Sequence, residues 1–286
     1  MNPLAKALWY IETNSGNAVS LDDVAACAGV SKFHLLRAFS AATGLSIMRY
    51  LRGRRLSAAA QRLAAGAPDI LAVAIDAGYG SHEAFTRAFR EQFGRTPEAL
   101  RAQGNLDGVA LLAPLRLDGD CIAIDPPRLA DGPLLLVAGI LERYGADHSS
   151  AGIPAQWQRF AGFIGQLRAQ VGTTTYGVCH NTDDEGNMDY LCAVQVGDFS
   201  ALPPELSRLR IAPRRYAVFF HRGHVSAIRP TWNAIWNDWL PQSNYVAADA
   251  PLIERYDDRF DSQSGNGGLE IWLPIAVNPD PKTVTG

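Results

Sequence analysis

Hydrophobic and polar positions follow a helical period from the start of the chain to about residue 103. Apolar side chains recur every three or four positions, and Gly or Pro interrupts the pattern at short intervals. Ser20 is a typical N-cap, and Gly44 and Gly94 stand where a helix would end. The pattern predicts seven helices, over residues 3–14, 21–28, 31–43, 47–65, 70–77, 81–93 and 97–103.

The pattern changes after residue 104. Residues 104–133 are rich in Gly, Pro and Asp, which is typical of a linker, and they contain an expected strand, "CIAI" (121–124). Alternating runs then predict strands at 134–140, 174–180, 189–196, 215–222 and 269–277, with helices at 154–170 and 229–242. We therefore expect an α+β multidomain protein, with an all-α domain (1–104), a linker (105–119), an α+β domain (120–280) and a tail (281–286).

The second domain repeats itself. Each half contains a strand, a Trp-bearing helix and a further strand: "PAQWQRFAGFI" corresponds to "RPTWNAIWNDWL", and "MDYLCAV" corresponds to "LEIWLPI". A repeat of this kind predicts two βαββ units around a pseudo-two-fold axis, with a cleft between them. It also predicts that the strand of Glu270 lies next to its counterpart around Asp189 and Tyr190.

The stretch "SHEAFTRAFREQF" (81–93) has an apolar face and a polar face. Phe85 and Phe89 share the apolar face, whereas Arg87 lies on the polar one. The apolar helix before it ends at Gly78, and only a short turn separates the two helices. Two helices joined by a tight Gly-containing turn are typical of a helix-turn-helix unit, whose second helix enters the DNA major groove.

The same plan occurs earlier in the chain. "LDDVAACAG" is followed by "VSKFHLLRAFSAATG", and the arginine-bearing segment "SIMRYLRGRRLSAAAQRLAAG" joins the two units. One such pattern could equally be a helical bundle with solvated arginines, but two joined copies favour DNA binding. Charge agrees, because residues 1–104 carry 12 Lys/Arg and 8 Asp/Glu, whereas the remainder carries 14 and 21. Only the first part is therefore suited to an anionic partner.

Residues 21–101 resemble the DNA-binding domain of the AraC/XylS family of transcription regulators, most clearly in "AIDAGYGSHEAFTRAFREQFGRTPEALR". The resemblance implies that two helix-turn-helix units read adjacent major-groove segments of double-stranded DNA, and it implies RNA polymerase as a further partner. Carried over by position, the recognition-helix contacts would come from Lys32, Phe33, Leu36 and Arg37, and from His82, Glu83, Ala84 and Arg87. We expect Arg49, Arg52 and Arg90 to add contacts to phosphates. Leu36 and Ala84 lack polar groups, which favours methyl contacts or backbone positioning there.

The part from about residue 120 to 280 resembles the GyrI-like small-molecule-binding domain, in "YAVFFHRGHVSAIRPTWNAIWNDWLPQSNY", "PLIERYDDRFD" and "GLEIWLPI". The resemblance implies a tandem βαββ fold whose central cleft binds bulky hydrophobic, often cationic, compounds through aromatic walls and a glutamate. A small-molecule effector is therefore an expected partner.

The residue chemistry points to candidates for this effector site. Glu270 and Trp272 share a face of their expected strand, and aromatic faces attract cations by roughly 0.5–2 kcal/mol each when they are desolvated. The expected ligand-binding set is Glu270, Trp272, Tyr190, Trp232, Trp236 and Tyr176. The alternatives are that the tryptophans form plain core and that Glu270 faces solvent. Glu254, in "LIERYDD", is a second acid candidate, but a structural or surface role is favoured for it.

Other chemistry is weakly indicated. His221 and His224 have a spacing that could hold a metal, but a structural role at a strand end is favoured, and we expect no metal, cofactor or catalytic residue. Adjacent residues Cys179 and His180 would point to opposite faces of a strand, so they form no catalytic dyad. The four cysteines form no C-x-x-C pair, and neither a signal peptide nor a membrane span is evident, which favours a cytoplasmic protein.

Two other functions stay open at this point. The second domain could be a small-molecule hydrolase with Glu270 as general base, or an interaction module whose cleft is filled by its own side chains.

Overall fold

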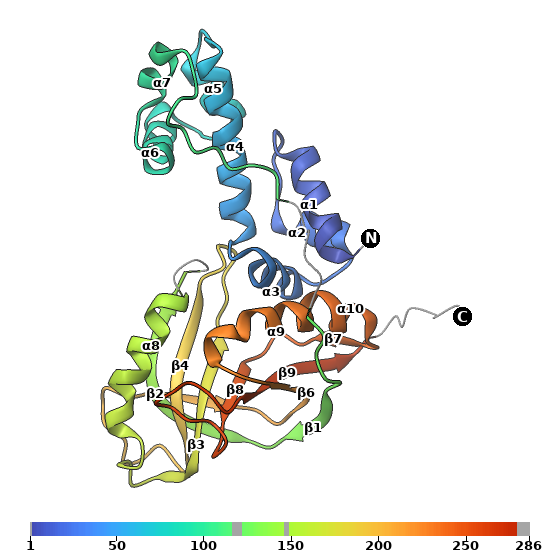
Figure 1. The fold of residues 1–286 in the computed structure, drawn as a ribbon, viewed down its shortest axis with the longest axis vertical. Helices are drawn as coiled ribbons and strands as arrows, with labels where there is room; N and C mark the ends of the chain where they lie inside the picture. The colour runs from blue at the N-terminus through green and yellow to red at the C-terminus, as the bar shows by residue number, and fades with distance from the viewer. Residues whose placement is uncertain (1, 116–121, 146–148, 279–286) are drawn as a thin grey trace, which may run out of the picture. The chain divides into compact units, whose positions relative to one another are not determined.

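The computed structural model describes residues 2–115, 122–145 and 149–278. Their contacts divide the chain into two compact units (Figure 1). Unit 1 comprises residues 1–32 and 47–119, and unit 2 comprises residues 33–46 and 120–286. The expected tail, 281–286, lies outside the described residues.

All seven helices expected in the first part of the chain are present. They are α1 (Pro3–Asn14), α2 (Leu21–Ala28), α3 (Lys32–Thr43), α4 (Ile47–Ala64), α5 (Ile70–Asp76), α6 (His82–Phe93) and α7 (Pro97–Gln103). Ser20 caps α2 in a capping box with Asp23, and Gly94 ends α6 with a positive φ of 68°. All of α3 beyond Lys32 is assigned to unit 2, so the contacts of this helix differ from those of its neighbours in sequence.

The apolar face of α6 forms the core of the second helix-turn-helix unit. Phe85, Phe89 and Phe93 are buried, and consecutive ring centroids lie 5.4 and 4.8 Å apart. They pack in one cluster with Leu56 and Leu63 of α4. Burial of each such side chain stabilises the fold by about 1.5–3 kcal/mol, so this face of α6 is committed to the core and the opposite face is left for other contacts.

The described part of the expected linker is docked on α4 rather than extended into solvent. The Leu112 N–H donates to Ser57 Oγ at 2.9 Å, and Arg54 Nη1 donates to the Leu112 carbonyl at 2.6 Å. Further along, the Leu115 N–H donates to the Tyr50 hydroxyl at 3.0 Å. These hydrogen bonds make residues 105–115 part of unit 1.

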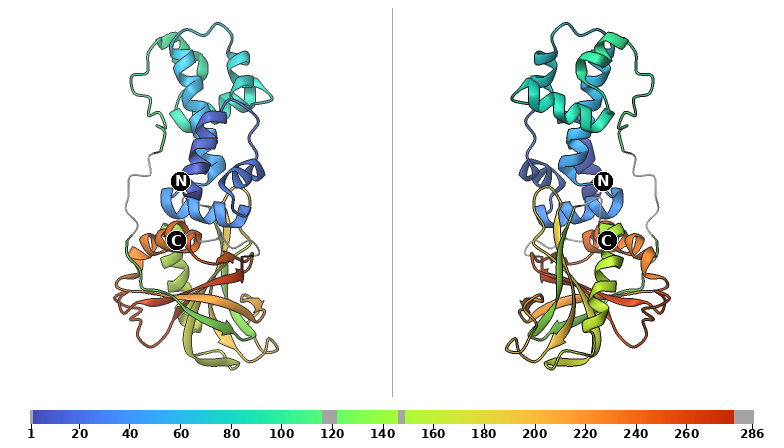
Figure 2. Two further views of the ribbon diagram at one scale, coloured as in Figure 1. Left: turned by 90° about the vertical axis from the view of Figure 1, so that its right-hand side faces the viewer. Right: turned by 90° about the vertical axis from the view of Figure 1, so that its left-hand side faces the viewer.

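Unit 2 is built on one antiparallel sheet, with helices packed on it. The strands are β1 (Arg128–Gly132), β2 (Leu135–Tyr144), β3 (Gln170–His180), β4 (Met188–Val196), β5 (Ser207–Ile211), β6 (Arg214–His221), β7 (Tyr245–Ala247), β8 (Leu252–Tyr256) and β9 (Leu269–Val277). The later helical elements are α8 (Ser149–Phe160), the 3-10 turns Ala161–Phe163 and Val225–Ala227, α9 (Ile228–Ala234), a π-helical turn (Ile235–Trp239) and α10 (Leu240–Gln242). The strong twist of the sheet is visible from the side (Figure 2).

The tandem βαββ repeat is confirmed. The strand order is β1-β6-β9-β8-β3-β4-β2-β5, in which β2, α8, β3 and β4 form one repeat and β6, α9, β8 and β9 form the other. The two repeats meet where β3 pairs with β8, from Thr175 opposite Tyr256 to Cys179 opposite Leu252. The order on one side of this pair mirrors the order on the other, so a pseudo-two-fold axis passes between β3 and β8.

The expected neighbourhood of the Glu270 strand was wrong. Glu270 lies on β9, and Asp189 and Tyr190 lie on β4, but β8 and β3 separate these two strands. The reason is that the middle strand of each repeat, rather than its last strand, faces the axis. The periodicity within a strand carries no information about this order.

Two expected element boundaries were also wrong. Residues 122–124 of the expected strand "CIAI" are irregular, and pairing starts at Arg128, because Pro126 and Pro127 have no N–H for a sheet ladder. Cys121 lies outside the described residues. The helix expected at 154–170 spans Ser149–Phe160 instead, and the chain after it includes Gly165 with a φ of 78°.

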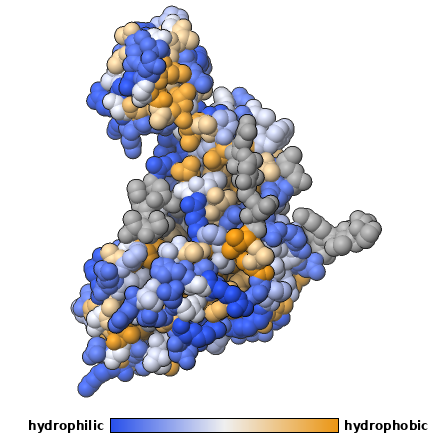
Figure 3. All heavy atoms as spheres, in the orientation of Figure 1, coloured by the Kyte–Doolittle hydropathy of each residue, from blue (hydrophilic) through white to orange (hydrophobic). Residues whose placement is uncertain are grey.

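The two faces of the sheet carry separate cores. Phe160 of α8 and Trp236 of the π-helical turn belong to one cluster, on the face that we call the helix-covered face. Tyr176, Tyr216 and Trp272 belong to a second cluster on the opposite face. Over unit 2, hydrophilic residues predominate on the surface seen in Figure 3. Among the described residues there is no helix with the length and apolar character that crossing a bilayer requires.

Candidate effector site and DNA-binding surface

Glu254 is the carboxylate that the fold encloses among aromatic side chains. It lies in the middle of β8, on the helix-covered face, and it is 8% exposed. Its carboxylate accepts hydrogen bonds from the hydroxyls of Tyr190 (2.8 Å) and Tyr256 (2.9 Å) and from Trp232 Nε1 (3.4 Å). Three elements, β4, β8 and α9, therefore converge on one carboxylate.

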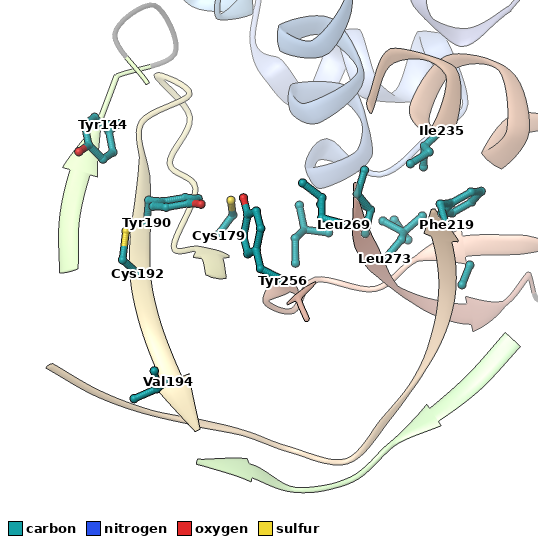
Figure 4. Close-up of a cluster of buried hydrophobic side chains, with 14 of the residues drawn as sticks. Tyr144, Cys179, Tyr190, Cys192, Val194, Phe219, Ile235, Tyr256, Leu269 and Leu273 are labelled. Atoms are coloured by element: carbon teal, nitrogen blue, oxygen red, sulfur yellow. The ribbon is translucent and has the colours of Figure 1, made fainter. Parts of the chain in front are cut away.

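Further aromatic rings surround this group. Trp157 of α8 packs edge-on against Tyr256, with ring centroids 5.4 Å apart, and its Nε1 donates to the Tyr190 hydroxyl at 3.3 Å. Trp232 stacks on Trp236 at 6.4 Å. Figure 4 shows Tyr190 and Tyr256 with their hydroxyls toward the middle of the concave face, beside Cys179. We call Glu254, Tyr190, Tyr256, Trp157 and Trp232 the Glu254 site.

Gly177 of β3 makes room for the Glu254 site. It is paired with Glu254 across the β3–β8 ladder. A Cβ atom at this position would lie 2.2 Å from the Tyr190 hydroxyl and 2.8 Å from Glu254 Oε2. Any side chain there would push against the carboxylate or its hydrogen-bond partner, so glycine is required by the close approach and not by its backbone angles.

The electrostatics of the Glu254 site favour a positively charged ligand. Burial raises the pKa of Glu254, and the hydrogen bonds from Tyr190, Tyr256 and Trp232 only partly oppose that effect. In the part of the chain that the structure describes, no Lys or Arg forms an ion pair with this carboxylate. A buried carboxylate with neutral donors alone is costly to ionise, and a cation held against aromatic faces would offset that cost.

Glu270 lies on the opposite face and already has cationic partners. It forms ion pairs with Arg128 (3.1 Å), Arg255 (3.2 Å) and Arg259 (3.6 Å), and Trp272 Nε1 donates to it at 3.0 Å. Burial alone would raise the pKa of Glu270, but the hydrogen bonds from Trp272 and Arg128 outweigh it, and the pKa is lowered. A carboxylate held ionised in this way is a weak general base and leaves little attraction for another cation.

The six residues expected to bind an effector therefore fall into two groups. Tyr190, Trp232 and Trp236 lie with Glu254 on the helix-covered face. Glu270, Trp272 and Tyr176 lie on the opposite face. From the sequence, Glu254 was only a second acid candidate with a structural or surface role favoured, because the strand β8 was not expected; Glu254 is in fact buried. Had β8 been expected, the alternation Leu252–Glu254–Tyr256 would have placed this carboxylate with the core.

The remaining candidate chemistry has structural explanations. His221 Nδ1 lies 2.8 Å from Thr231 Oγ1 and its Nε2 lies 3.2 Å from the His224 carbonyl, which ties the end of β6 to α9. Burial raises the pKa of Cys179 to about 12, so this thiol is not an activated nucleophile. Among the described residues, no group of His, Cys, Asp and Glu could hold a metal ion.

The outer face of α6 is an open, mixed-charge surface. Glu83, Arg87 and Arg90 are exposed, and they line a shallow concavity with His82, Thr86 and Glu91. His82 Nε2 lies 2.8 Å from Glu98 Oε1, which ties the start of α6 to α7. Ala84 is half-buried, and Arg49 and Arg52 are exposed on α4. Four of the five α6 residues expected to contact DNA thus lie along this concavity.

The α3 residues expected to contact DNA are in a different situation. Lys32 pairs with Asp22 at 3.3 Å within unit 1. Leu36 is 6% exposed, and Phe33 is half-buried against Trp236, with ring centroids 5.9 Å apart. Arg37 is hydrogen-bonded to residues of the β3–β4 hairpin of unit 2.

Comparison with known proteins agrees with both parts of this description. Residues 24–103 match a helix-turn-helix domain, and residues 126–276 match the GyrI-like small molecule binding domain. The chain is 28% identical to the right origin-binding protein of Escherichia coli and 28% identical to the transcriptional regulator Rob of Salmonella typhimurium, in each case over 94% of this chain and 96% of the relative. Its N-terminal part is 38% identical to the regulatory protein SoxS of Escherichia coli over 92 residues, which are 32% of this chain and 86% of SoxS.

These relatives are regulators of transcription or DNA-binding proteins by name, and the comparisons give no support to the hydrolase alternative. The GyrI-like match covers more than half of the chain, and the helix-turn-helix match covers the part with two such units. The chain therefore belongs to the AraC/XylS family of transcription regulators, with a helix-turn-helix DNA-binding domain followed by a GyrI-like small-molecule-binding domain.

Proposed function

We propose that this regulator responds to a hydrophobic, aromatic cation bound at the Glu254 site. The observation that carries the proposal is a buried carboxylate that has Tyr and Trp donors but no ion-pair partner in the described chain. Each aromatic face in contact with a desolvated cation would contribute about 0.5–2 kcal/mol. The carboxylate would supply the remaining selectivity for positive charge.

The charge of the ligand and the charge of Glu254 provide the test. Tetraphenylphosphonium and tetraphenylborate have nearly the same size and shape and opposite charge. In titration calorimetry we expect the wild-type protein to prefer the cation. Glu254→Gln keeps the shape of the side chain, and we expect it to weaken cation binding at least tenfold, or about 1.4 kcal/mol, while leaving binding of the anion unchanged or improved.

Glu270→Gln is the matched control, because it is the same substitution on the opposite face of the same sheet. It should leave the affinity for the cation within about twofold of the wild type. A large loss with Glu270→Gln and none with Glu254→Gln would reject the Glu254 site and restore Glu270 as the effector residue.

We propose that DNA contacts come from α6, α4 and α3. On α6, the open concavity with Arg87 and Arg90 supports this assignment, together with His82, Glu83 and Ala84. On α4, Arg49 and Arg52 would reach phosphates. On α3, the residues would be Lys32, Phe33, Leu36 and Arg37.

We also propose RNA polymerase as a partner and the cytoplasm as the location, because a regulator of this family acts where bacterial DNA is transcribed. The test for the first is whether purified RNA polymerase supershifts the protein–DNA complex. Failure to form a ternary complex on a promoter with a bound site would contradict it.

A further inference from the structure

Arg37, a residue of the first recognition helix α3, is hydrogen-bonded to the β3–β4 hairpin of the GyrI-like domain. Arg37 Nη2 donates to Thr182 Oγ1 at 2.6 Å, and Nη1 donates to Met188 Sδ at 3.2 Å. Thr182 and Met188 lie on either side of the β3–β4 turn. A side chain that AraC-type domains would present to DNA is thus occupied by the small-molecule-binding domain of the same chain.

This contact compensates the charge of Arg37 poorly. The Nε atom is buried and has no hydrogen-bond partner among the described residues, and a thioether sulfur is only a weak acceptor. The described chain places no carboxylate within ion-pair distance of the guanidinium, although the charge of Glu254 attracts it from further away. A partly buried guanidinium with such partners is costly, so this contact weakens the docked arrangement relative to a fully paired one.

The other docking contacts come from α9 and the π-helical turn. Phe33 and His34 pack on Trp236, with centroids 5.9 and 5.5 Å away, and His34 Nε2 lies 3.0 Å from the Trp236 carbonyl. Asn237 Nδ2 donates to the Ala38 carbonyl at 3.0 Å. The face of α3 that contacts the GyrI-like domain is therefore the face that holds Phe33, His34 and Arg37.

The end of α3 is also attached to this surface. Arg229 Nε donates to the Ala41 carbonyl at 3.1 Å, and Ala41 is in the last helical turn, where carbonyls lack partners within the helix. A cation at a helix C-terminus adds a favourable interaction with the helix dipole. The docking surface thus extends along most of α3.

The continuous helical segment of α9 and the π-helical turn links the residues that contact α3 to the Glu254 site. Trp236, which contacts Phe33 and His34, stacks on Trp232, and Trp232 Nε1 donates to Glu254. A ligand that reaches Glu254 would take the place of this Trp232 contact or push against the stacked pair. Its positive charge would also repel Arg37, which Glu254 otherwise attracts.

We propose that the docked α3 is an autoinhibited state in which the GyrI-like domain withholds the first recognition helix from DNA, and that an aromatic cation at Glu254 disfavours this docking. The second half of the proposal rests on the function proposed for the Glu254 site, whereas the first half does not. Docking lowers the apparent DNA affinity by the fraction of molecules whose α3 is free. A ligand that prefers the undocked state raises that fraction.

The first experiment needs no ligand. Thr182→Val with Met188→Leu removes both acceptors of Arg37 and keeps the side-chain volumes, without changing any residue of the helix-turn-helix units. We expect the double variant to bind a DNA site selected by this protein from random sequence about 5–20-fold more tightly than the wild type. Hydrogen exchange of the α3 amides from 34 to 43 should become faster.

Thr173→Val is the matched control, because Thr173 is an exposed threonine of β3 near the end of the strand that is far from Thr182 and Met188. It should change neither DNA affinity nor α3 exchange. Arg229→Ala, which removes the bond to the Ala41 carbonyl from a different element, is the second undocking variant and should act in the same direction. If properly folded double and Arg229→Ala variants bind DNA like the wild type, the autoinhibited state is disproved.

The second experiment adds tetraphenylphosphonium. In the wild type it should raise DNA affinity and α3 exchange together, and in the double variant it should change DNA affinity by less than about twofold. The cation could instead bind in a Glu254-dependent manner without changing α3 exchange or DNA affinity. That result would disprove the link between ligand binding and α3 docking, but it would support the effector site. Lack of binding would reject the proposed effector, while the ligand-free variants would still decide the docking.

Discussion

Two glutamates on neighbouring strands of the sheet, Glu254 on β8 and Glu270 on β9, show how strongly the surroundings of a residue determine its electrostatic state. Glu254 and Glu270 are both on strands of unit 2, and both contact a tryptophan N–H. Glu254 faces neutral donors in a core, and its pKa is raised by burial. Glu270 faces three arginines, and its pKa is lowered. The same residue type is therefore enclosed by neutral hydrogen-bond donors on one face of the sheet and held among arginines on the other.

The raised pKa of Glu254 predicts a pH dependence. A group whose pKa is higher in the folded state stabilises that state below its unfolded pKa, and this contribution is lost as pH rises through the folded pKa. We expect the free energy of unfolding of unit 2 to fall over that window in the wild type, and less so in Glu254→Gln. Cation affinity should rise over the same window, because the carboxylate becomes ionised.

Urea titrations at a series of pH values can measure this difference by tryptophan fluorescence, since Trp9 is the only Trp in unit 1 and the other five belong to unit 2. Equal pH dependence in the wild type and in Glu254→Gln would show that Glu254 keeps an ordinary pKa.

Arg87 provides a prediction about base reading. Its side chain is exposed on α6, next to a core face that Phe85 and Phe89 fill. If Arg87 reads a base, Arg87→Ala should weaken binding to a selected site by about 1–3 kcal/mol, with much less effect on random DNA. Fluorescence anisotropy with both duplexes measures this. An equal loss on both would indicate a phosphate contact, and no loss on either would remove Arg87 from the interface.

At the scale of elements, the junction of β3 and β8 is where the two repeats form one site. Gly177 of β3 and Glu254 of β8 are direct partners across this junction, and Tyr190 from β4 reaches over Gly177 to the carboxylate. Each repeat alone would lack part of the arrangement. The tandem βαββ architecture thus brings the two middle strands, β3 and β8, together at its axis, and the proposed effector site depends on this pairing.

Gly177→Ala tests the importance of that junction. The added methyl group would meet the Tyr190 hydroxyl and Glu254 Oε2, so the hydrogen bond between them has to lengthen or break. We expect unit 2 to lose about 1–3 kcal/mol of stability, as overpacked cores do, and to bind aromatic cations more weakly. Chemical denaturation and calorimetry are the measurements. Wild-type values in both would mean that the site is loose enough to accept a side chain.

At the scale of the whole molecule, DNA binding should depend steeply on salt. Arginines on α4 and α6 are exposed, and each phosphate contact contributes a slope of about −0.9 to a plot of log affinity against log salt concentration. If the GyrI-like domain withholds α3, a variant that frees this helix should show a steeper slope than the wild type, because Arg37 can then reach a phosphate. A flat salt dependence would argue against DNA as the partner.

The sequence by itself determined the local structure and the family. Periodicity and capping residues predicted the seven N-terminal helices closely, since helix ends depend on side chains near in sequence, such as Ser20 and Gly94. The internal repeat predicted the βαββ pair and its axis, and the two helix-turn-helix patterns predicted the DNA-binding domain.

Only the tertiary structure decided which carboxylate is enclosed and where α3 packs. The hydration of Glu254 depends on Tyr190, Trp157 and Trp232, which are between 22 and 97 residues away along the chain. Likewise, the sequence pattern marks Arg37 only as a polar residue of a recognition helix, and its contacts with Thr182 and Met188 are seen only in the folded structure. Burial and electrostatic environment arise from contacts between distant segments, and a local pattern of hydrophobic and polar positions cannot encode them.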